Sequence, residues 1–215
     1  MPATTKTPRT KLRPLPKRGR HDRETIDAIL DEALVAHMGF VHDGQPVVIP
    51  TLHARIGDEV LVHGSSASRA LGALADGAPM CLTVTLIDGL VLARSAFHHS
   101  VNYRSVVLLG QARLLESREE KEAALEAFTE KVTPGRWEHV RWPTAKELKA
   151  TKVLALPIDE ASAKVRSGPP GDDEEDYAMD TWAGVVPLRV TAGTPEDDPL
   201  LRAGIPVPEH VARLT

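Results

Sequence analysis

A turn between residues 63 and 69 has the residue types of an anion-binding site. It reads His63-Gly-Ser-Ser-Ala-Ser-Arg69 and joins a predicted strand to a short helix predicted to end at Ala75. Free backbone N–H groups and the helix dipole favour an anion at the start of a helix. An ordinary capped helix with a surface arginine is the alternative. The groups that would complete a phosphate site are the hydroxyls of Ser65, Ser66 and Ser68 and the guanidinium of Arg69.

A second candidate segment, Ile49-Pro-Thr-Leu-His-Ala-Arg55, lies within a predicted strand. Proline cannot donate to a sheet ladder, so Pro50 indicates an edge, a bulge or a ladder left open. Backbone groups freed in this way could bind a planar heterocycle. Arg55 is expected on the strand paired with the one that leads to Ser65, where it would share the anion. The alternative is that Arg55 simply faces solvent.

The third candidate segment runs from Arg94 to Ser105 and contains His98-His99 and Tyr103-Arg104. Neighbouring residues of a strand point to opposite faces, so one metal ion would not take both histidines. No cysteine cluster or His-x₃-His helix supports zinc. We therefore expect no metal site, and favour Tyr103 and Arg104 as residues that line a ligand.

Composition and missing motifs exclude several classes of protein. The chain lacks Gly-x-Gly-x-x-Gly, a Walker loop and Gly-x-Ser-x-Gly, which removes support for dinucleotide folds, P-loop NTPases and α/β-hydrolases. A net charge of −4 and 4% aromatic residues argue against nucleic acid as a partner. The single cysteine, Cys81, suits a reducing compartment. With neither an apolar span nor a signal peptide in sight, we expect a cytoplasmic protein without a membrane partner.

The element pattern predicts a mainly β protein with flanking helices. Asp-Gly pairs at 43–44 and 88–89 separate apolar β-rich runs and predict hairpins. Helices are predicted at 22–32 and 117–132. Residues 1–20 hold seven Lys/Arg, no acidic residue and four prolines, and predict a disordered basic arm. The domain is expected over 21–190, as an antiparallel barrel, and an irregular tail over 191–215.

Four stretches together resemble the flavin-binding split-barrel superfamily related to pyridoxamine 5′-phosphate oxidase, and in particular its Nim-type nitroimidazole-resistance branch. They are Val48–Arg55, Leu61–Arg69, Ser100–Val107 with Gly110–Arg113, and the helix ending at Lys131–Gly135. The resemblance covers roughly residues 20–165. It implies a six-stranded antiparallel Greek-key split barrel that forms a homodimer, with FMN at the interface.

The resemblance also assigns roles to residues. Ser65, Ser66, Ser68 and Arg69 would hold the FMN phosphate, and Ile49, Pro50, Thr51 and Leu52 would border the isoalloxazine ring. Tyr103 and Arg104 would reach the partner's site, and His63 would lie close to flavin or substrate. The strand Pro-Thr-Leu-His-Ala-Arg replaces the Arg-x-x-Leu-Leu-Lys-like strand of the oxidase branch, and the C-terminal substrate-recognition segment is not recognisable. We therefore do not expect oxidation of pyridoxamine phosphate.

These features favour an FMN-dependent oxidoreductase that reduces a small electrophile, such as a nitro compound or a quinone. Its flavin would carry the chemistry, and His63 is the candidate catalytic proton donor. A non-catalytic flavin or haem carrier or sensor is the alternative. The candidate haem ligands are His53, His63, His98 and His99. A nucleic-acid partner bound through the basic arm is a third reading, against which the acidic remainder of the chain counts.

Overall fold

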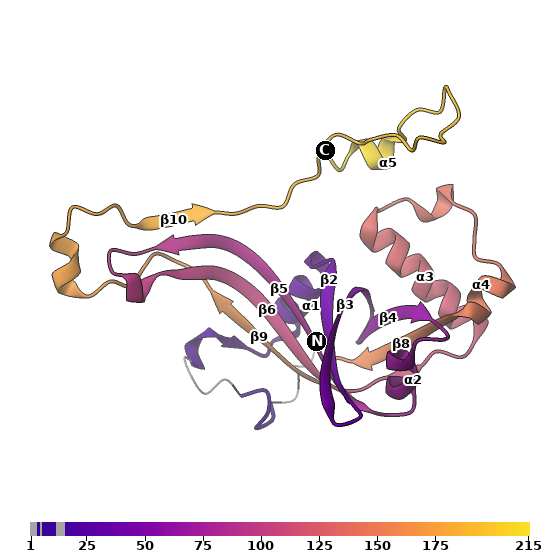
Figure 1. Ribbon diagram of the computed structural model, residues 1–215, viewed down its shortest axis with the longest axis horizontal. Coiled ribbons are helices and arrows are strands. Elements are labelled where there is room, and N and C mark those ends of the chain that lie inside the picture. Colours follow the sequence, from indigo (N-terminus) through magenta and orange to yellow (C-terminus); the bar gives the residue numbers. More distant parts are fainter. Residues whose placement is uncertain (1–3, 5, 12–15) are drawn as a thin grey trace.

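An antiparallel sheet forms the body of the protein (Figure 1). The structure is a computed structural model that describes residues 4, 6–11 and 16–215. Its strands are β1 (Gly19–Arg20), β2 (Val35–His42), β3 (Gln45–Ile56), β4 (Glu59–Ser65), β5 (Pro79–Leu92), β6 (Ser100–Gln111), β7 (Arg113–Leu114), β8 (Thr151–Pro157), β9 (Glu160–Arg166) and β10 (Gly184–Pro187). The α-helices are α1 (Arg23–Glu32), α2 (Arg69–Ala75), α3 (Arg118–Val132), α4 (Ala145–Ala150) and α5 (Glu209–Ala212). Short 3-10 turns are η1 (Pro16–Arg18), η2 (Ala96–His98), η3 (Trp137–His139) and η4 (Glu174–Ala178).

The strands follow the order β1-β9-β6-β5-β2-β3-β4-β8-β7, and β10 pairs with β5 beyond the reach of β2. The terminal strands β1 and β7 do not pair with each other in the described residues, so the sheet curls without closing. The mainly β, antiparallel class is therefore as expected. The expected count of six strands is wrong, because ten strands form within the described residues. Three of these, β1, β7 and β10, are short and are added at the margins of the sheet.

Strand β3 belongs to both halves of the curled sheet. Its residues 45–52 pair with β2, and its residues 53–56 pair with β4. Over residues 45–52, no strand among the described residues pairs with the second edge of β3. This arrangement agrees with the open ladder expected from Pro50, which pairs with His37 on the β2 side.

Helix α1 fills the inside of the curl. Asp22 caps it by accepting a hydrogen bond of 2.9 Å from the backbone N–H of Thr25. Ile26, Ile29 and Leu30 recur at helical spacing and are buried in the main core against β3, β5, β6 and β9. The local sequence thus sets both the start of the helix and the face that it buries.

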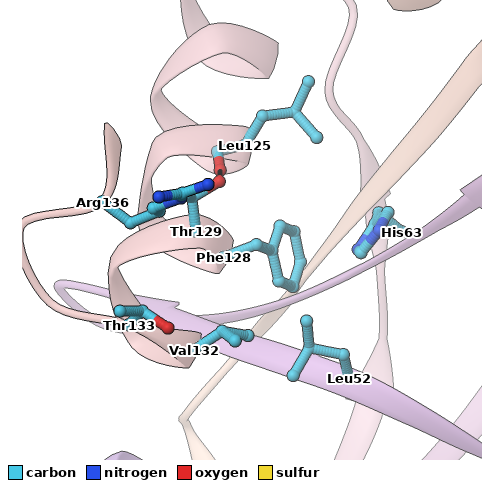
Figure 2. A pocket seen from close by; sticks show the side chains of 8 residues that line it. All are labelled: Leu52, His63, Leu125, Phe128, Thr129, Val132, Thr133 and Arg136. Atoms are coloured by element: carbon cyan, nitrogen blue, oxygen red, sulfur yellow. Dashed lines mark hydrogen bonds between the residues drawn. The ribbon is translucent and has the colours of Figure 1, made fainter. Parts of the chain in front are cut away.

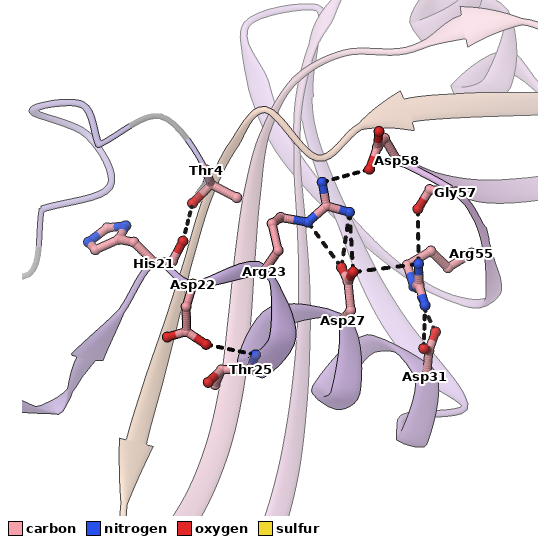
Figure 3. A network of polar contacts seen from close by, with 10 residues as sticks. All are labelled: Thr4, His21, Asp22, Arg23, Thr25, Asp27, Asp31, Arg55, Gly57 and Asp58. Atoms are coloured by element: carbon pink, nitrogen blue, oxygen red, sulfur yellow. Dashed lines mark hydrogen bonds and ion pairs between the residues drawn. The ribbon is translucent and has the colours of Figure 1, made fainter. Parts of the chain in front are cut away.

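Two arginines join α1 to the hairpin between β3 and β4 (Figure 3). Arg23 Nε donates to Asp27 at 3.1 Å, and its Nη1 donates to Asp58 at 2.9 Å. Arg55 Nε donates to Asp31 at 2.8 Å, and its Nη1 donates to the carbonyl oxygen of Gly57 at 2.9 Å. These bonds hold the helix and the hairpin in one orientation.

The two Asp-Gly pairs behave differently. Asp43 and Gly44 both have positive φ, at 49° and 74°, and form the predicted tight turn between β2 and β3. The hairpin predicted at Asp88-Gly89 is wrong, because β5 continues through it to Leu92 with an irregular register. Gly89 instead permits the approach of β10: a Cβ there would lie 3.0 Å from the carbonyl oxygen of Val186.

The basic arm lies against β9 where it is described. The hydroxyl of Thr4 donates to the carbonyl oxygen of Ala161 at 2.9 Å, and β1 pairs with β9. Its composition predicts a free segment, but these residues of the arm bind to β9, whose outer edge has backbone groups left to pair. Residues 1–3, 5 and 12–15 lie outside the described residues, and disorder there stays a prediction.

After β10 the chain runs as an irregular segment towards α5 (Figure 1). The ring of His210 in α5 stacks on that of His139 in η3, the turn that follows α3. Between β10 and α5 no helix or strand forms in the described residues, and α5 is a single turn. The division of the chain into a domain over 21–190 and a tail over 191–215 stays a prediction. Within the part of the chain that the structure covers, none of the helices is long and apolar enough to cross a membrane.

Candidate functional site

The serine-rich turn forms at the end of β4, and its own backbone uses two of its hydroxyls. Ser68 Oγ caps α2 by accepting from the N–H of Leu71 at 3.3 Å. Ser65 Oγ accepts from the N–H of Ala67 at 3.2 Å. Ser66 and Arg69 are exposed, and no carboxylate among the described residues pairs with Arg69. The turn therefore offers an anion the hydroxyl of Ser66 and the charge of Arg69.

A lysine that the sequence did not single out also reaches this turn. Strand β8 pairs with β4 so that Lys152 lies opposite Gly64. Its Nζ lies 3.6 Å from the position that a Cβ on Gly72 of α2 would occupy. The sequence separation of the two strands hides this neighbour, since a lysine near the start of a predicted strand carries no signal of its own. Together, Arg69 and Lys152 bring two positive charges to the turn.

The side chain of His63 lines a cleft between β4 and α3 (Figure 2). The cleft has a volume of about 420 Å³. Its other lining residues are Leu52, Leu125, Phe128, Thr129, Val132, Thr133 and Arg136. Most of these side chains are apolar, and Arg136 supplies the one positive charge among them. Since alternate residues of a strand share a face, His63 and Ser65 point to the same side of β4, and the cleft adjoins the serine-rich turn.

The imidazole of His63 packs against Phe128, and one of its ring nitrogens makes no hydrogen bond within the described residues. Its ring centroid lies 4.2 Å from that of Phe128, and its Nδ1 is buried without a hydrogen-bond partner among the described residues. Burial lowers the pKa of His63, which keeps the ring neutral near pH 7. A neutral imidazole with an unpaired nitrogen is suited to bind a metal centre or to exchange a proton with a ligand.

Strand β3 contributes the predicted ring-binding segment to the same region. Leu52 lines the His63 cleft, while Ile49 packs against the main core. Pro50 is exposed and Thr51 is half-buried. The hydroxyl of Thr51 donates to the carbonyl oxygen of Leu52 at 3.1 Å. The structure thus brings the end of this segment, but not all of it, to the His63 cleft.

Arg55 does not reach the serine-rich turn. It pairs with Val60, five residues before Ser65, which places it roughly 17 Å away along β4. Its guanidinium is bound by Asp31, which raises the pKa of Arg55. The prediction that Arg55 shares the anion does not fit this register, because an antiparallel partner runs away from the turn.

The other candidate histidines lie apart from the cleft. His53 is fully buried, and its Nε2 donates to the carbonyl oxygen of Leu30 at 2.9 Å. His98 and His99 lie at the far end of the β5–β6 hairpin, where His98 faces Asp173 at 3.2 Å and His99 faces the carbonyl oxygen of Ser95 at 2.9 Å. Among the four candidate haem ligands, only His63 lines this cleft.

Tyr103 and Arg104 lie on β6, outside the His63 cleft. Arg104 pairs with Asp88 at 2.8 Å and with Glu32, and these carboxylates raise its pKa. It lines a second cleft, of about 920 Å³, that extends to the chain after β10. Any role of Tyr103 and Arg104 in a partner's site stays a prediction.

Comparison with known proteins adds one family and several solved structures. Residues 22–165 match the model of the pyridoxamine 5′-phosphate oxidase family. No match was found among curated proteins. The structure of the flavocytochrome Anf3 from Azotobacter vinelandii is 46% identical, covers 97% of each chain and superposes with a TM-score of 0.91. An FAD and haem binding protein from Mycobacterium smegmatis is 42% identical over 92% of this chain and 97% of its own, with a TM-score of 0.88.

A third structure shares the fold at lower identity. It is a protein from Bacteroides thetaiotaomicron assigned to 5-nitroimidazole antibiotic resistance, 22% identical over 68% of this chain and 86% of its own, with a TM-score of 0.58. The resemblance inferred from the four sequence stretches is thereby confirmed.

Proposed function

Because the chain belongs to the pyridoxamine 5′-phosphate oxidase family, in which its 46% and 42% identical relatives are a flavocytochrome and an FAD and haem binding protein, we propose that it binds both a flavin and a haem. When bound, the flavin would supply two-electron redox chemistry and the haem would supply one-electron redox chemistry, so the protein would serve as an electron-transfer unit. The observation that carries this proposal is the unpaired, neutral imidazole of His63 in an apolar cleft.

The residues around His63 fit a haem. Histidine is a common axial ligand of haem iron, and the ligand must be unprotonated. The low pKa of His63 meets that requirement, and the absence of a bond from the described residues to its Nδ1 leaves the ring free to be oriented by a ligand. Phe128 and Leu52 give the cleft apolar walls against a porphyrin, and Arg136 is placed to pair with a propionate.

The serine-rich turn fits the phosphate of a flavin nucleotide. Ser66, Arg69 and Lys152 offer a hydroxyl and two positive charges within the described residues. The relative that binds FAD favours FAD over the FMN expected from the sequence resemblance. Both nucleotides carry a phosphate for this turn, so the assignment of these residues does not depend on the choice. Leu52 links the ring-binding segment of β3 to the haem cleft.

We propose that a small electrophile, such as a nitro compound or a quinone, accepts electrons at the cleft, and that a homodimer is the working form. His63 as an iron ligand would replace His63 as the proton donor expected from the sequence, because the ring nitrogen that binds iron can no longer carry a proton. A non-catalytic carrier or sensor would bind the same groups but would not be reduced by NADH or NADPH.

The absorbance spectrum of the purified protein tests the proposal. Wild-type protein is expected to show flavin bands and a Soret band, and His63→Ala is expected to lose the Soret band while it keeps the flavin. His98→Ala is the matched control, since this histidine lies at the far end of the β5–β6 hairpin. A Soret band that survives in His63→Ala would overturn the ligand assignment, and a wild-type protein that retains no haem when supplied with it would overturn the haem site.

A further inference from the structure

The last residue of β9, Arg166, is a buried arginine without a counter-charge. It is 8% exposed, and no carboxylate among the described residues pairs with it. The residues outside the description, 1–3, 5 and 12–15, contain no Asp or Glu, so the chain has no other carboxylate to offer. A buried charge that lacks a counter-charge is costly. The position therefore calls for an anion from outside the chain.

The guanidinium of Arg166 is held from one side, and its other edge is left free. Its Nη1 donates to the side-chain oxygen of Asn102, whose amide nitrogen in turn donates to the carbonyl oxygen of Gly168 at 3.1 Å. Neither Nε, which is buried, nor Nη2 has a hydrogen-bond partner within the described residues. The N–H groups of Nε and Nη2 form the parallel pair that binds two oxygens of one anion. Asn102 thus fixes the orientation of a binding edge that nothing in the described chain uses.

Two further positive charges lie near Arg166. Lys164 shares its face of β9, since alternate residues of a strand point to the same side, and Val165 between them packs against the core. The Nζ of Lys164 lies 5.8 Å from the ring centre of Tyr103, the residue of β6 opposite Arg166. Burial lowers the pKa of Arg166, and the charge of Arg18 in η1 lowers it further. Three cations therefore gather here, and no carboxylate of the described residues pairs with any of them.

The basic arm brings one of these cations to the end of β9. Its strand β1 pairs with β9 at Ala163 and Lys164 and stops short of Arg166. Figure 1 shows the indigo N-terminal segment beside β9, on the side of the sheet opposite to α2. Four strands lie between β9 and β4 in the order of the sheet. The three cations are therefore separate from the serine-rich turn, and neither the flavin nor the haem proposed above uses them.

We propose that Arg166, Lys164 and Arg18 bind a phosphate group, either free or on a small molecule, and that this anion fastens η1 and β1 to β9. A phosphate group carries about 1.5 to 2 negative charges at pH 7 and three acceptor oxygens. Two oxygens fit the free edge of Arg166, and the third is left for Lys164 or Arg18. A carboxylate has two oxygens and one charge, so it would leave the other cations without a partner. Between Arg18 and Arg166 the phosphate replaces a repulsion by two attractions.

Calorimetric titration of the full-length protein with inorganic phosphate, in the presence of excess FAD, tests the site. Wild-type protein is expected to bind phosphate, and Arg166→Gln is expected to raise the dissociation constant at least about tenfold, because it removes the charged binding edge. Arg20→Gln removes an equal charge from the exposed part of β1 and is the matched control. A wild type that binds no phosphate, or a constant that rises with Arg69→Ala and not with Arg166→Gln, would overturn the proposal. The dependence on Arg166 can be measured whether or not FAD binds, so the proposed function fails separately.

Two further titrations separate the role of the site from effects on folding, and identify the source of the phosphate. Arg18→Gln changes a half-buried side chain that makes no hydrogen bond or ion pair among the described residues, and it should also weaken binding. Wild-type affinity in Arg18→Gln would remove the arm from the site and overturn the proposal. Phenyl phosphate is titrated beside inorganic phosphate: equal or tighter binding supports a phosphorylated small molecule as the ligand, and binding of inorganic phosphate alone supports the free ion.

Amide hydrogen exchange on the wild type measures the fastening of the arm directly. Exchange in η1 and β1 requires this segment to leave β9, and the bound anion opposes that step. Phosphate at ten times its dissociation constant should therefore slow exchange over residues 16–20 by about tenfold. Sodium chloride at the same ionic strength is the control and should not slow it. Exchange that phosphate and chloride affect equally would refute the proposed role of the anion.

Discussion

The buried imidazole of His53 should make the stability of the protein depend on pH. The ring is fully enclosed, and burial, with a smaller effect from the charge of Lys131, lowers the pKa of His53 from 6.5 to about 4. Between these two values the unfolded chain binds a proton that the folded protein does not accept. The stability linked to His53 is therefore fully present above pH 6.5 and is lost as the pH falls towards 4.

The size of the effect follows from the two pKa values. A difference of one unit corresponds to about 1.4 kcal/mol, so the whole shift is worth about 3 kcal/mol. Linkage places about 2 kcal/mol of this between pH 7 and pH 5. That is a large part of the free energy of unfolding of an ordinary domain, which is about 5–15 kcal/mol.

Urea unfolding of the wild type and of His53→Gln, at pH 7 and pH 5 and at one protein concentration, measures this term. Glutamine does not titrate, and its amide can still donate to the carbonyl oxygen of Leu30. The wild type should lose about 2 kcal/mol more than the variant on acidification. His63, whose pKa burial also lowers, contributes equally to both proteins and cancels. Equal losses in the two proteins would refute the assignment of a neutral, proton-excluding His53.

Three further predictions concern the turn, the approach of β10 and the polar network of α1. Arg69→Ala should weaken flavin binding by about 10- to 100-fold, because a charge-assisted phosphate contact is worth about 1.5–3 kcal/mol. An unchanged dissociation constant by fluorescence titration would remove Arg69 from the site. Gly89→Val should lower the free energy of unfolding by about 1–3 kcal/mol, because the valine side chain would meet the backbone of β10. The control Gly171→Ala, at a glycine with open space around it, should leave the urea unfolding midpoint unchanged. Arg23→Ala should lower the free energy of unfolding by about 3 kcal/mol, because it removes a buried guanidinium that pairs with two carboxylates. Arg118→Ala breaks an exposed pair and should lower it by less than about 1 kcal/mol. Similar losses for the two variants in urea unfolding would contradict the burial argument.

The sequence predicted correctly those features that depend only on residues close together in the chain. The turn at Asp43-Gly44 depends on the φ values of two residues, and the cap of α1 depends on one side chain and one N–H group. The hairpin predicted at Gly89 was wrong because this glycine serves a tertiary contact. It leaves room for β10, which follows it by about a hundred residues in the sequence. A short motif cannot distinguish these two uses of glycine.

The residues of the candidate site also differ in whether the sequence could reveal them. The serine-rich turn and His63 could be found because strand, turn and helix follow one another along the chain. The cleft around His63 could not, since its second wall is α3, and Lys152 is likewise delivered by a distant strand. Arg55 was assigned to the anion from strand pairing alone, and the register that carries it to the far end of β4 was not readable from the sequence.

The passage of β3 through both halves of the sheet makes it a mechanical link between them. Leu52 is its last residue paired with β2, and His53 is its first paired with β4. Any rotation of one half against the other must bend the chain between these two residues, one of which lines the cleft and the other of which is sealed in the core. A ligand that fills the cleft would therefore contact β3 at the residue where the strand passes from one half of the sheet to the other.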